Sequence, residues 1–410
     1  MSTKDKILAR NHDDVLEQIA KRLDISQSMY EKAEDRYKSI GDWLDREESD
    51  IAKYDPEISP QGSFLLGTVT KPPSDADDYD VDLICLLRAS KKDFTQKELK
   101  ESVGREVKGY MEAHGMINPA EEGRRCWTVH YADDACFHMD VLPALPDSGR
   151  FQLMLESRGH KALAANQSLT DHALSITDKT HPTYAQFSDD WPQSNPKGYA
   201  AWFKQRMRVR LHDQKRLFVE RSLITASVDD IPDYKVKTPL QRAIQLLKRH
   251  RDVLFADDPD HKPISIIITT LAAHAYNEEG TVSEALRNIL QSMDGYIHEI
   301  DGEFWVANPV NPDENFADKW SEEPRKRDNF FRWLNQARLD FATYLRSPFN
   351  SIPDSLKSHL GEKVVASVQE GLSSLTNDTT GDLPQSARTA AAVDQIRRSG
   401  SQSRPWSKGL

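Results

Sequence analysis

Cysteine is scarce in this 410-residue chain. Cys85, Cys126 and Cys136 are scattered and form no C-x-x-C pair, so the sequence indicates neither a disulfide framework nor a zinc ribbon. No apolar run approaches the ~20 residues that a membrane span needs, and the first residues lack the apolar stretch of a secretory signal. We therefore expect a cytoplasmic protein without a membrane partner.

An excess of positive charge is also missing. The net charge is −11 and the isoelectric point is near 5.7. Long-range electrostatics therefore oppose non-specific binding to a nucleic-acid backbone, and a polymerase that tracks long DNA or RNA would usually be more basic. An acidic enzyme that handles free, metal-bound nucleotides meets no such objection.

The chain is long enough for two packed lobes. Periodic apolar residues predict helices over roughly the first 55 residues and over most of 198–350. Beyond Thr376 the sequence has few large apolar residues and is basic, so we expect disorder there.

The most informative stretch joins a Gly-Ser turn to two closely spaced carboxylates. Gly62 and Ser63 are followed, after a polar loop with prolines, by Asp80 and Asp82 on a predicted strand. Residues i and i+2 of a strand point to the same side, roughly 6.5–7 Å apart, so both carboxylates face one volume. The other face of this strand is apolar, with Val81, Leu83, Cys85 and Leu87. Two carboxylates on the exposed face of an otherwise buried strand are costly to place, so metal binding is a better explanation for them than a chance arrangement.

A third carboxylate has the same setting. Trp127 to Tyr131 predicts a strand, and Ala135 to Leu142 predicts a returning strand. Alternation puts Asp140 on one face with His138, and Phe137 and Met139 on the other. Taken alone, Asp140 would more often be an ordinary surface residue. For His138 a packed or hydrogen-bonded histidine is the expected role.

These residues suit transfer of a nucleotidyl group, in which a hydroxyl attacks the α-phosphate of a triphosphate and pyrophosphate leaves. Two Mg²⁺ ions ~3.5–4 Å apart can support that reaction, and Mg²⁺ prefers oxygen ligands. Asp80 and Asp82 would bridge both ions, and Asp140 would bind the ion on the acceptor side. Gly62 and Ser63 would hold the β- and γ-phosphates, since a missing side chain lets the backbone approach closely.

A cation must offset the remaining charge of the triphosphate. Lys248 is the candidate, on the polar side of a helix predicted over Leu240 to Leu254. Ser265 could add a hydroxyl from the next segment, roughly Pro263 to Tyr276, which we predict to be a helix although its composition also fits a strand. The alternative for the run from Lys248 to Arg251 is an ordinary solvated face.

These motifs give the sequence a resemblance to a known family. The Gly-Ser turn, the Asp-x-Asp pair and the later Asp140 are similar to the active site of the polymerase-beta-like nucleotidyltransferases. More narrowly, the chain resembles bacterial cyclic-oligonucleotide synthases related to cyclic GMP-AMP synthase, which serve antiphage signalling. The narrower resemblance depends on blocks between roughly residues 60 and 320, among them Gln61-Gly62-Ser63-Phe64-Leu65-Leu66-Gly67-Thr68, Lys237-Thr238-Pro239-Leu240-Gln241-Arg242-Ala243 and Asn308-Pro309-Val310-Asn311-Pro312.

The resemblance implies an α+β fold in which a mixed-sheet catalytic lobe packs against a mainly helical lobe. It implies N-terminal helices on both lobes (1–55), a catalytic lobe (56–200), a helical lobe that closes the nucleotide pocket (201–375) and a flexible basic tail (376–410). The metal ligands would be Asp80, Asp82 and Asp140, and the triphosphate would contact Gln61, Gly62, Ser63, Lys248 and Ser265.

The implied function is Mg²⁺-dependent synthesis of a cyclic di- or trinucleotide messenger from ATP and GTP, with a cyclic GMP-AMP isomer as the preferred product. No cluster of His and Cys matches the zinc module of the animal relatives, so we expect no activation by double-stranded DNA. A regulatory protein partner that grasps the basic tail is a further possibility on family analogy.

Two alternatives stay open at this stage. The chain could transfer nucleotides to an RNA end, a protein or a small molecule. It could also be a regulatory module that binds nucleotides without catalysis, although the complete set of three aspartates argues against a decayed site.

Overall fold

A computed structural model describes residues 3–73, 79–131, 137–222, 236–348 and 351–377. Cys136, the predicted start of the second strand at Ala135 and the basic tail from residue 378 onwards lie outside these ranges. No helix within them is both long and apolar enough to cross a membrane.

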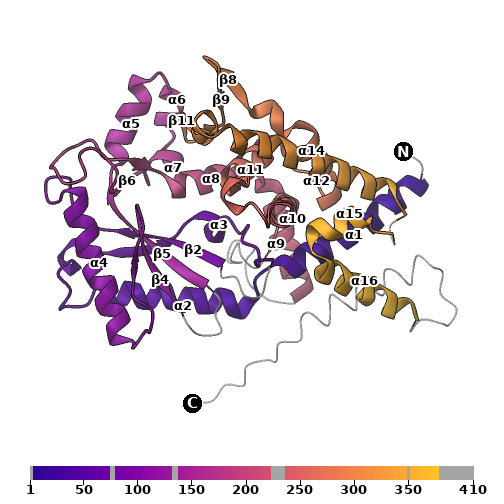
Figure 1. Cartoon of the computed structure of the whole chain (residues 1–410), viewed down its shortest axis with the longest axis horizontal. Helices are drawn as coiled ribbons and strands as arrows, with labels where there is room; N and C mark the ends of the chain where they lie inside the picture. The colour runs from indigo at the N-terminus through magenta and orange to yellow at the C-terminus, as the bar shows by residue number, and fades with distance from the viewer. Residues whose placement is uncertain (1–2, 74–78, 132–136, 223–235, 349–350, 378–410) are drawn as a thin grey trace.

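A mixed sheet forms one half of the molecule (Figure 1). Its central strands β2 and β5 are parallel, and every other pairing in the sheet is antiparallel. The order is β1-β2-β5-β4-β3, with β6 against the end of β5 and β7 beside β6. The strands are β1 (Glu57–Pro60), β2 (Tyr79–Leu86), β3 (Glu121–Glu122), β4 (Trp127–His130), β5 (Phe137–Pro146), β6 (Leu174–Ile176) and β7 (Gln193–Ser194).

One face of this sheet packs on the helices α2 (Gln27–Leu44) and α4 (Gln96–Ala113). Alternation decides which side chains do so, because Val81, Leu83 and Cys85 of β2 and Met139 and Val141 of β5 are fully buried against these helices. The opposite face carries the intervening polar residues, as the sequence predicted. α4 starts at a capping box in which Thr95 and Glu98 exchange hydrogen bonds.

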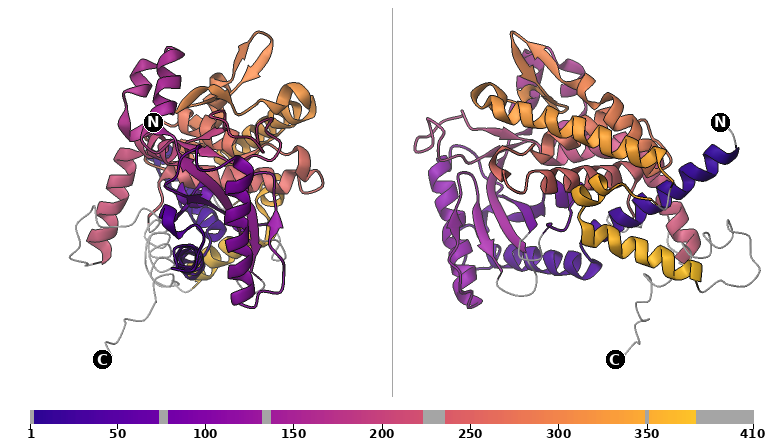
Figure 2. Two further views of the ribbon diagram at one scale, coloured as in Figure 1. Left: turned by 90° about the vertical axis from the view of Figure 1, so that its left-hand side faces the viewer. Right: turned by 45° about the vertical axis from the view of Figure 1, so that its right-hand side comes forward.

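Helices make up the other half, so the predicted α+β fold is confirmed. In the right-hand view of Figure 2 the purple sheet lies to the left, and the orange helices lie above and to the right of it. A single apolar cluster joins α1 (Thr3–Leu23), α8 (Pro196–Arg206), α10 (Pro239–Leu254), α11 (Ser265–Ala275), α12 (Val282–Ser292), α14 (Pro324–Arg346), α15 (Asp354–Leu360) and α16 (Glu362–Asn377). The first helix therefore packs on the helical half, whereas α2 packs on the sheet.

Shorter elements connect these parts. Residues 148–170 form α5 (Ser148–Ser157), α6 (Lys161–Ala164) and α7 (Gln167–Thr170). Two hairpins interrupt the helical half, β8 (His298–Ile300) with β9 (Glu303–Trp305), and β10 (Ala307–Asn308) with β11 (Asn311–Asn315). The remaining elements are η1 (Ala52–Tyr54), α3 (Gly62–Leu65), α9 (Arg208–Ser222), η4 (Pro259–His261), η5 (Met293–Tyr296) and α13 (Lys319–Glu322).

The central helix of the helical half, α10, has strong local signals. Thr238 and Gln241 form a capping box, and Pro239 occupies the first turn. Every residue from Pro239 to Arg251 is buried, because α10 contacts helices on one side and the loop that follows α3 on the other. The segment after it is the helix α11, so the prediction of a helix rather than a strand for residues 263–276 is confirmed.

Candidate active site

The three predicted carboxylates meet on one face of the sheet. In the parallel register of β2 and β5, Asp82 lies directly beside Asp140, and Asp80 lies beside His138. Neighbouring strands are about 4.8 Å apart, so the Asp82 and Asp140 side chains project side by side. Further along the same face, an apolar cluster that includes Ile84 and Leu142 covers the sheet. The polar site is therefore confined to the first half of both strands.

The carboxylates repel one another. Burial, together with the neighbouring charges of Asp80 and Asp140, raises the pKa of Asp82 to about 6. The side chain of Asp80 is 66% exposed, so the group opens to solvent on that side. A divalent cation would relieve the repulsion of Asp82 by the two neighbouring carboxylates. Carboxylate oxygens are also the ligands that Mg²⁺ prefers. The donor set therefore fits a magnesium site.

Neighbouring side chains orient two of the three carboxylates. His138 Nε2 lies 2.9 Å from Asp80 Oδ1, and this hydrogen bond is the main reason why the pKa of Asp80 is lowered. Thr128, on the adjacent strand β4, donates from its hydroxyl to Asp140 Oδ1. The prediction that His138 is a hydrogen-bonded histidine near the site is confirmed, whereas no sequence pattern pointed to Thr128.

The Gly-Ser turn crosses directly over Asp82. The backbone N–H of Gln61 donates to the carbonyl of Asp82 at 2.8 Å, which continues the β1–β2 pairing as far as the turn. Gly62 then has φ of +58°, a backbone conformation that L-residues rarely adopt. A Cβ added there would collide with the carboxylate of Asp82. Gly62 is thus required by its conformation and by contact with a catalytic candidate. Ser63 is the second residue of the short helix α3, and its carbonyl accepts from Thr68 N–H.

The chain that follows this turn docks on one face of α10. The side chains of Gln241, Gln245 and Lys248 donate to the carbonyls of Leu66, Val69 and Thr68 at 2.9, 2.8 and 3.1 Å. Arg249 donates to the carbonyls of Lys71 and Pro72 at 2.8 and 3.2 Å. Positions spaced by three and four residues share one helix face, so a single face of α10 satisfies the backbone of the loop.

Lys248 is part of that interface rather than of a solvated helix face. Its residue is only 6% exposed, which corrects both the polar-side placement and the alternative of a solvated basic run. Burial and the charge of Arg251 lower the pKa of Lys248 to about 8, although Asp252, Asp82 and Asp80 favour the charged ammonium. The buried ammonium therefore lies within electrostatic range of the carboxylates.

Ser265 begins α11 and is held by a neighbouring cation. Its hydroxyl accepts a hydrogen bond from Arg251 Nη1 at 2.9 Å. Arg251 also donates to the carbonyl of Pro263 and to Asp252. Among the described contacts, Ser265 bonds to Arg251 and not to an aspartate, and the side chain of Gln61 makes no capping bond.

Sequence reasoning missed a second lysine. The ammonium of Lys262 lies 3.2 Å from Asp252 Oδ1 and near enough to Asp80 to lower the pKa of that carboxyl. No motif contains Lys262, and only its closeness in sequence to Ser265 could have suggested it.

Comparison with known proteins shows what this chain is similar to. Residues 56–143 match the family model for the nucleotidyltransferase domain of DncV-like cyclic GMP-AMP synthases. A c-di-GMP synthase of Roseivirga ehrenbergii is 29% identical over 325 residues, which cover 79% of this chain and 77% of that protein. The cyclic dinucleotide synthase CdnG of Bradyrhizobium diazoefficiens is 24% identical over 366 residues, covering 86% and 81%.

Solved structures show the same fold. CdnG in complex with GTP superposes with a TM-score of 0.63 at 21% identity over 87% of this chain and 97% of that one. CdnC of E. coli MS115-1, in complex with HORMA-deltaN, superposes with a TM-score of 0.56 at 12% identity over 85% and 96%. The chain accordingly carries a nucleotidyltransferase domain that matches the DncV-like model at residues 56–143, and over most of its length it is similar to bacterial cyclic dinucleotide synthases.

Proposed function

We propose that this enzyme joins two purine nucleoside triphosphates, at least one of them GTP, into a cyclic dinucleotide. The observation that carries the proposal is the register that brings Asp82 beside Asp140, with Asp80 on the same face and the buried Lys248 within electrostatic range. Guanine is favoured because one similar protein is a c-di-GMP synthase and another, CdnG, has been solved with GTP. Both c-di-GMP and a cyclic GMP-AMP isomer satisfy this proposal.

Asp80, Asp82 and Asp140 would hold Mg²⁺. The ions would neutralise charge on the triphosphate and would make the acceptor hydroxyl more acidic. Support for this assignment comes from the raised pKa of Asp82, whose causes are burial first and then the neighbouring charges of Asp80 and Asp140.

The residues of the chain then have separate tasks in each transfer. Lys248 presents a positive charge to the triphosphate, and the turn at Gly62 and Ser63 holds it against the sheet. Asp140, fixed by Thr128, takes the proton of the attacking ribose hydroxyl. The oxygen forms a bond to the α-phosphorus, the α–β phosphoanhydride bond breaks, and the electron pair leaves with pyrophosphate. A second transfer within the linear intermediate closes the ring and releases a second pyrophosphate.

Product analysis tests the proposal directly. The full-length protein is incubated with ATP, GTP, CTP, UTP and Mg²⁺, without any acceptor, and the mixture is treated with phosphatase before mass spectrometry. We expect a phosphatase-resistant cyclic dinucleotide that contains guanine and is not formed with excess chelator. A strict need for RNA, protein or a small-molecule acceptor would support the other transferase class. Nucleotide binding without turnover would support a regulatory module.

The variant Asp82→Asn shows whether the carboxylate site is responsible. We expect it to abolish turnover, whereas Asp42→Asn on the exposed side of α2 should retain full activity. Undiminished product from the Asp82 variant would refute the assignment of the site.

The physiological part of the proposal follows from the family resemblance. We propose that the product acts in cytoplasmic antiphage signalling and that double-stranded DNA does not activate the enzyme, in keeping with the net charge of −11. Partner control is supported by CdnC, which was solved with HORMA-deltaN. The concentration of the product should rise in phage-infected cells, and a constant concentration would contradict the role in defence. Added DNA should leave the rate of the purified enzyme unchanged, and an increase in rate would contradict the second point.

A further inference from the structure

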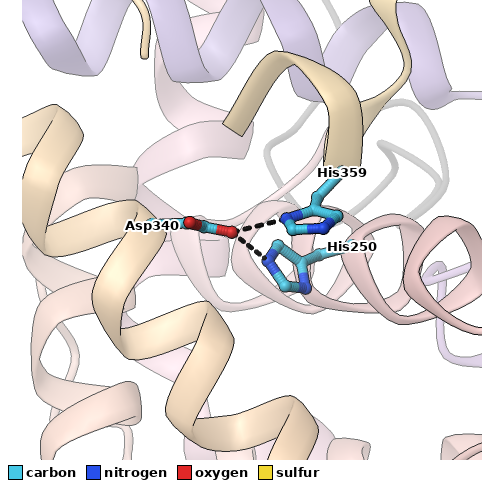
Figure 3. A group of neighbouring side chains, drawn as sticks. All are labelled: His250, Asp340 and His359. Atoms are coloured by element: carbon cyan, nitrogen blue, oxygen red, sulfur yellow. Dashed lines mark hydrogen bonds and ion pairs between the residues drawn. The ribbon is translucent and has the colours of Figure 1, made fainter. Parts of the chain in front are cut away.

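A second polar cluster lies inside the helical half, apart from the aspartates. It joins His250 of α10, Asp340 of α14 and His359 of α15, which converge as Figure 3 shows. His250 Nε2 and His359 Nδ1 lie 3.0 and 2.6 Å from the same atom, Asp340 Oδ2. One ligand atom from each residue can be chosen so that all three lie within 4.8 Å of one another. The sequence shows no such cluster, because the three residues belong to distant helices.

The cluster is enclosed but not sealed. The side chains of His250 and Asp340 are 0% and 1% exposed, whereas that of His359 is 20% exposed and opens a route from solvent. The second carboxylate oxygen, Oδ1, accepts from Gln336 Nε2 at 2.9 Å, so the carboxyl group is held in a fixed orientation. A metal ligand is usually oriented by such an outer hydrogen bond.

Asp340 is buried beside the two imidazoles, its ionisable partners. One ring nitrogen of each imidazole approaches the same carboxylate oxygen, and within the described residues Asp340 forms ion pairs with these two imidazoles and with no Lys or Arg. A buried carboxyl group is costly unless its charge is paired, so a cation between the three side chains would be well placed.

We propose that His250, Asp340 and His359 bind a divalent transition-metal ion, for which Zn²⁺ is the probe. Two imidazole nitrogens and one carboxylate oxygen are a donor set that Zn²⁺ and its neighbours in the first transition row favour over Mg²⁺. On binding, each nitrogen that faces Asp340 coordinates through its lone pair, and its proton resides on the other ring nitrogen.

The ion would fasten α14 and α15 to the helix that carries Lys248. His250 follows Lys248 by two residues, which on a helix is rather more than half a turn, so the two side chains leave α10 in roughly opposite directions. Lys248 donates to the carbonyl of Thr68 in the loop after α3, while His250 faces α14 and α15. The proposed site is therefore structural, distinct from the Mg²⁺ site, and independent of the proposed product.

Metal content of the full-length protein, free of any histidine tag, tests this inference. The protein is loaded with Zn²⁺ in the presence of saturating Mg²⁺, desalted and analysed by mass spectrometry for metals. We expect one Zn²⁺ per chain and a melting temperature that falls when a strong chelator removes it, because a ligand that binds only the folded state stabilises that state. His359→Gln should lose both effects, whereas His172→Gln, at an exposed histidine, should keep them.

Two further measurements keep the result decisive. Should His359→Gln fail to fold, Co²⁺ substitution in the unaltered protein should give visible d–d bands without a thiolate charge-transfer band, since no cysteine takes part. Asp82→Asn should still bind one Zn²⁺, which separates this site from the aspartates. The inference is overturned when the unaltered protein retains no Zn²⁺, when the His359 variant retains as much, or when Asp82→Asn loses it.

Discussion

The contact between Gly62 and Asp82 gives the sharpest prediction for mutagenesis. Alanine at position 62 must adopt a φ near +58°, which costs roughly 1–2 kcal/mol for an L-residue. Its Cβ would also meet Asp82 Oδ2 at a separation that real atoms do not allow, so the carboxylate must move. A displacement of about 1 Å at a reacting centre can cost about 10²-fold in rate. We expect Gly62→Ala to reduce the rate of pyrophosphate release by at least about 10²-fold.

Gly115 offers a matched control for backbone strain. It has φ of +61°, and a Cβ added there meets no atom within 4 Å. Gly115→Ala should therefore lower the melting temperature through backbone strain alone, by no more than Gly62→Ala does, while leaving turnover unchanged. Both variants are compared by thermal unfolding and by initial rates of pyrophosphate release. The reasoning is refuted when Gly62→Ala keeps activity within a few fold, or when Gly115→Ala loses as much.

Three further predictions concern residues outside the carboxylates. Lys248→Met should raise the KM for the triphosphate by about tenfold or more, because a hydrogen bond to a charged group is worth roughly 1.5–3 kcal/mol. An unchanged KM in initial-rate kinetics would contradict this role of Lys248. Gln245→Leu leaves the carbonyl of Val69 without its donor, so urea unfolding should show a free energy of unfolding that is lower by about 1–3 kcal/mol. The control Gln291→Leu, at an exposed position of α12, should lower it by no more than about 0.5 kcal/mol. Burial lowers the pKa of His274 to about 4, so its contribution to stability is present above the ordinary value of 6.5 and is lost as the pH falls towards 4. His274→Phe should remove this part of the acid sensitivity, and melting curves of both proteins that fall in parallel would argue against it.

Local patterns predicted the parts of the site that depend on a single element. Alternation along β2 and β5 was enough to put Asp80, Asp82 and Asp140 on polar faces, and the predicted helices around Lys248 and after Pro263 are confirmed. The α+β fold followed from the family resemblance, not from composition.

Contacts between distant segments were beyond prediction. The spacing of Gln241, Gln245 and Lys248 marks one face of a helix, but nothing local says that this face meets backbone carbonyls rather than water. The role of Gly62 against Asp82 and the meeting of His250 with Asp340 likewise depend on packing in three dimensions. Such contacts leave no periodicity in the sequence, so only the structure reveals them.

The parallel pairing of β2 with β5 also has a consequence for biosynthesis. Parallel neighbours need a crossover connection, and here α4 and β4 intervene before Asp140 reaches Asp82. A chain emerging from the ribosome thus carries two acidic residues long before the third arrives, and Lys248 follows later still. On the proposed function, truncated or stalled translation products that lack Asp140 or Lys248 would have no complete centre, so a cyclic dinucleotide could be made only by chains synthesised past α10.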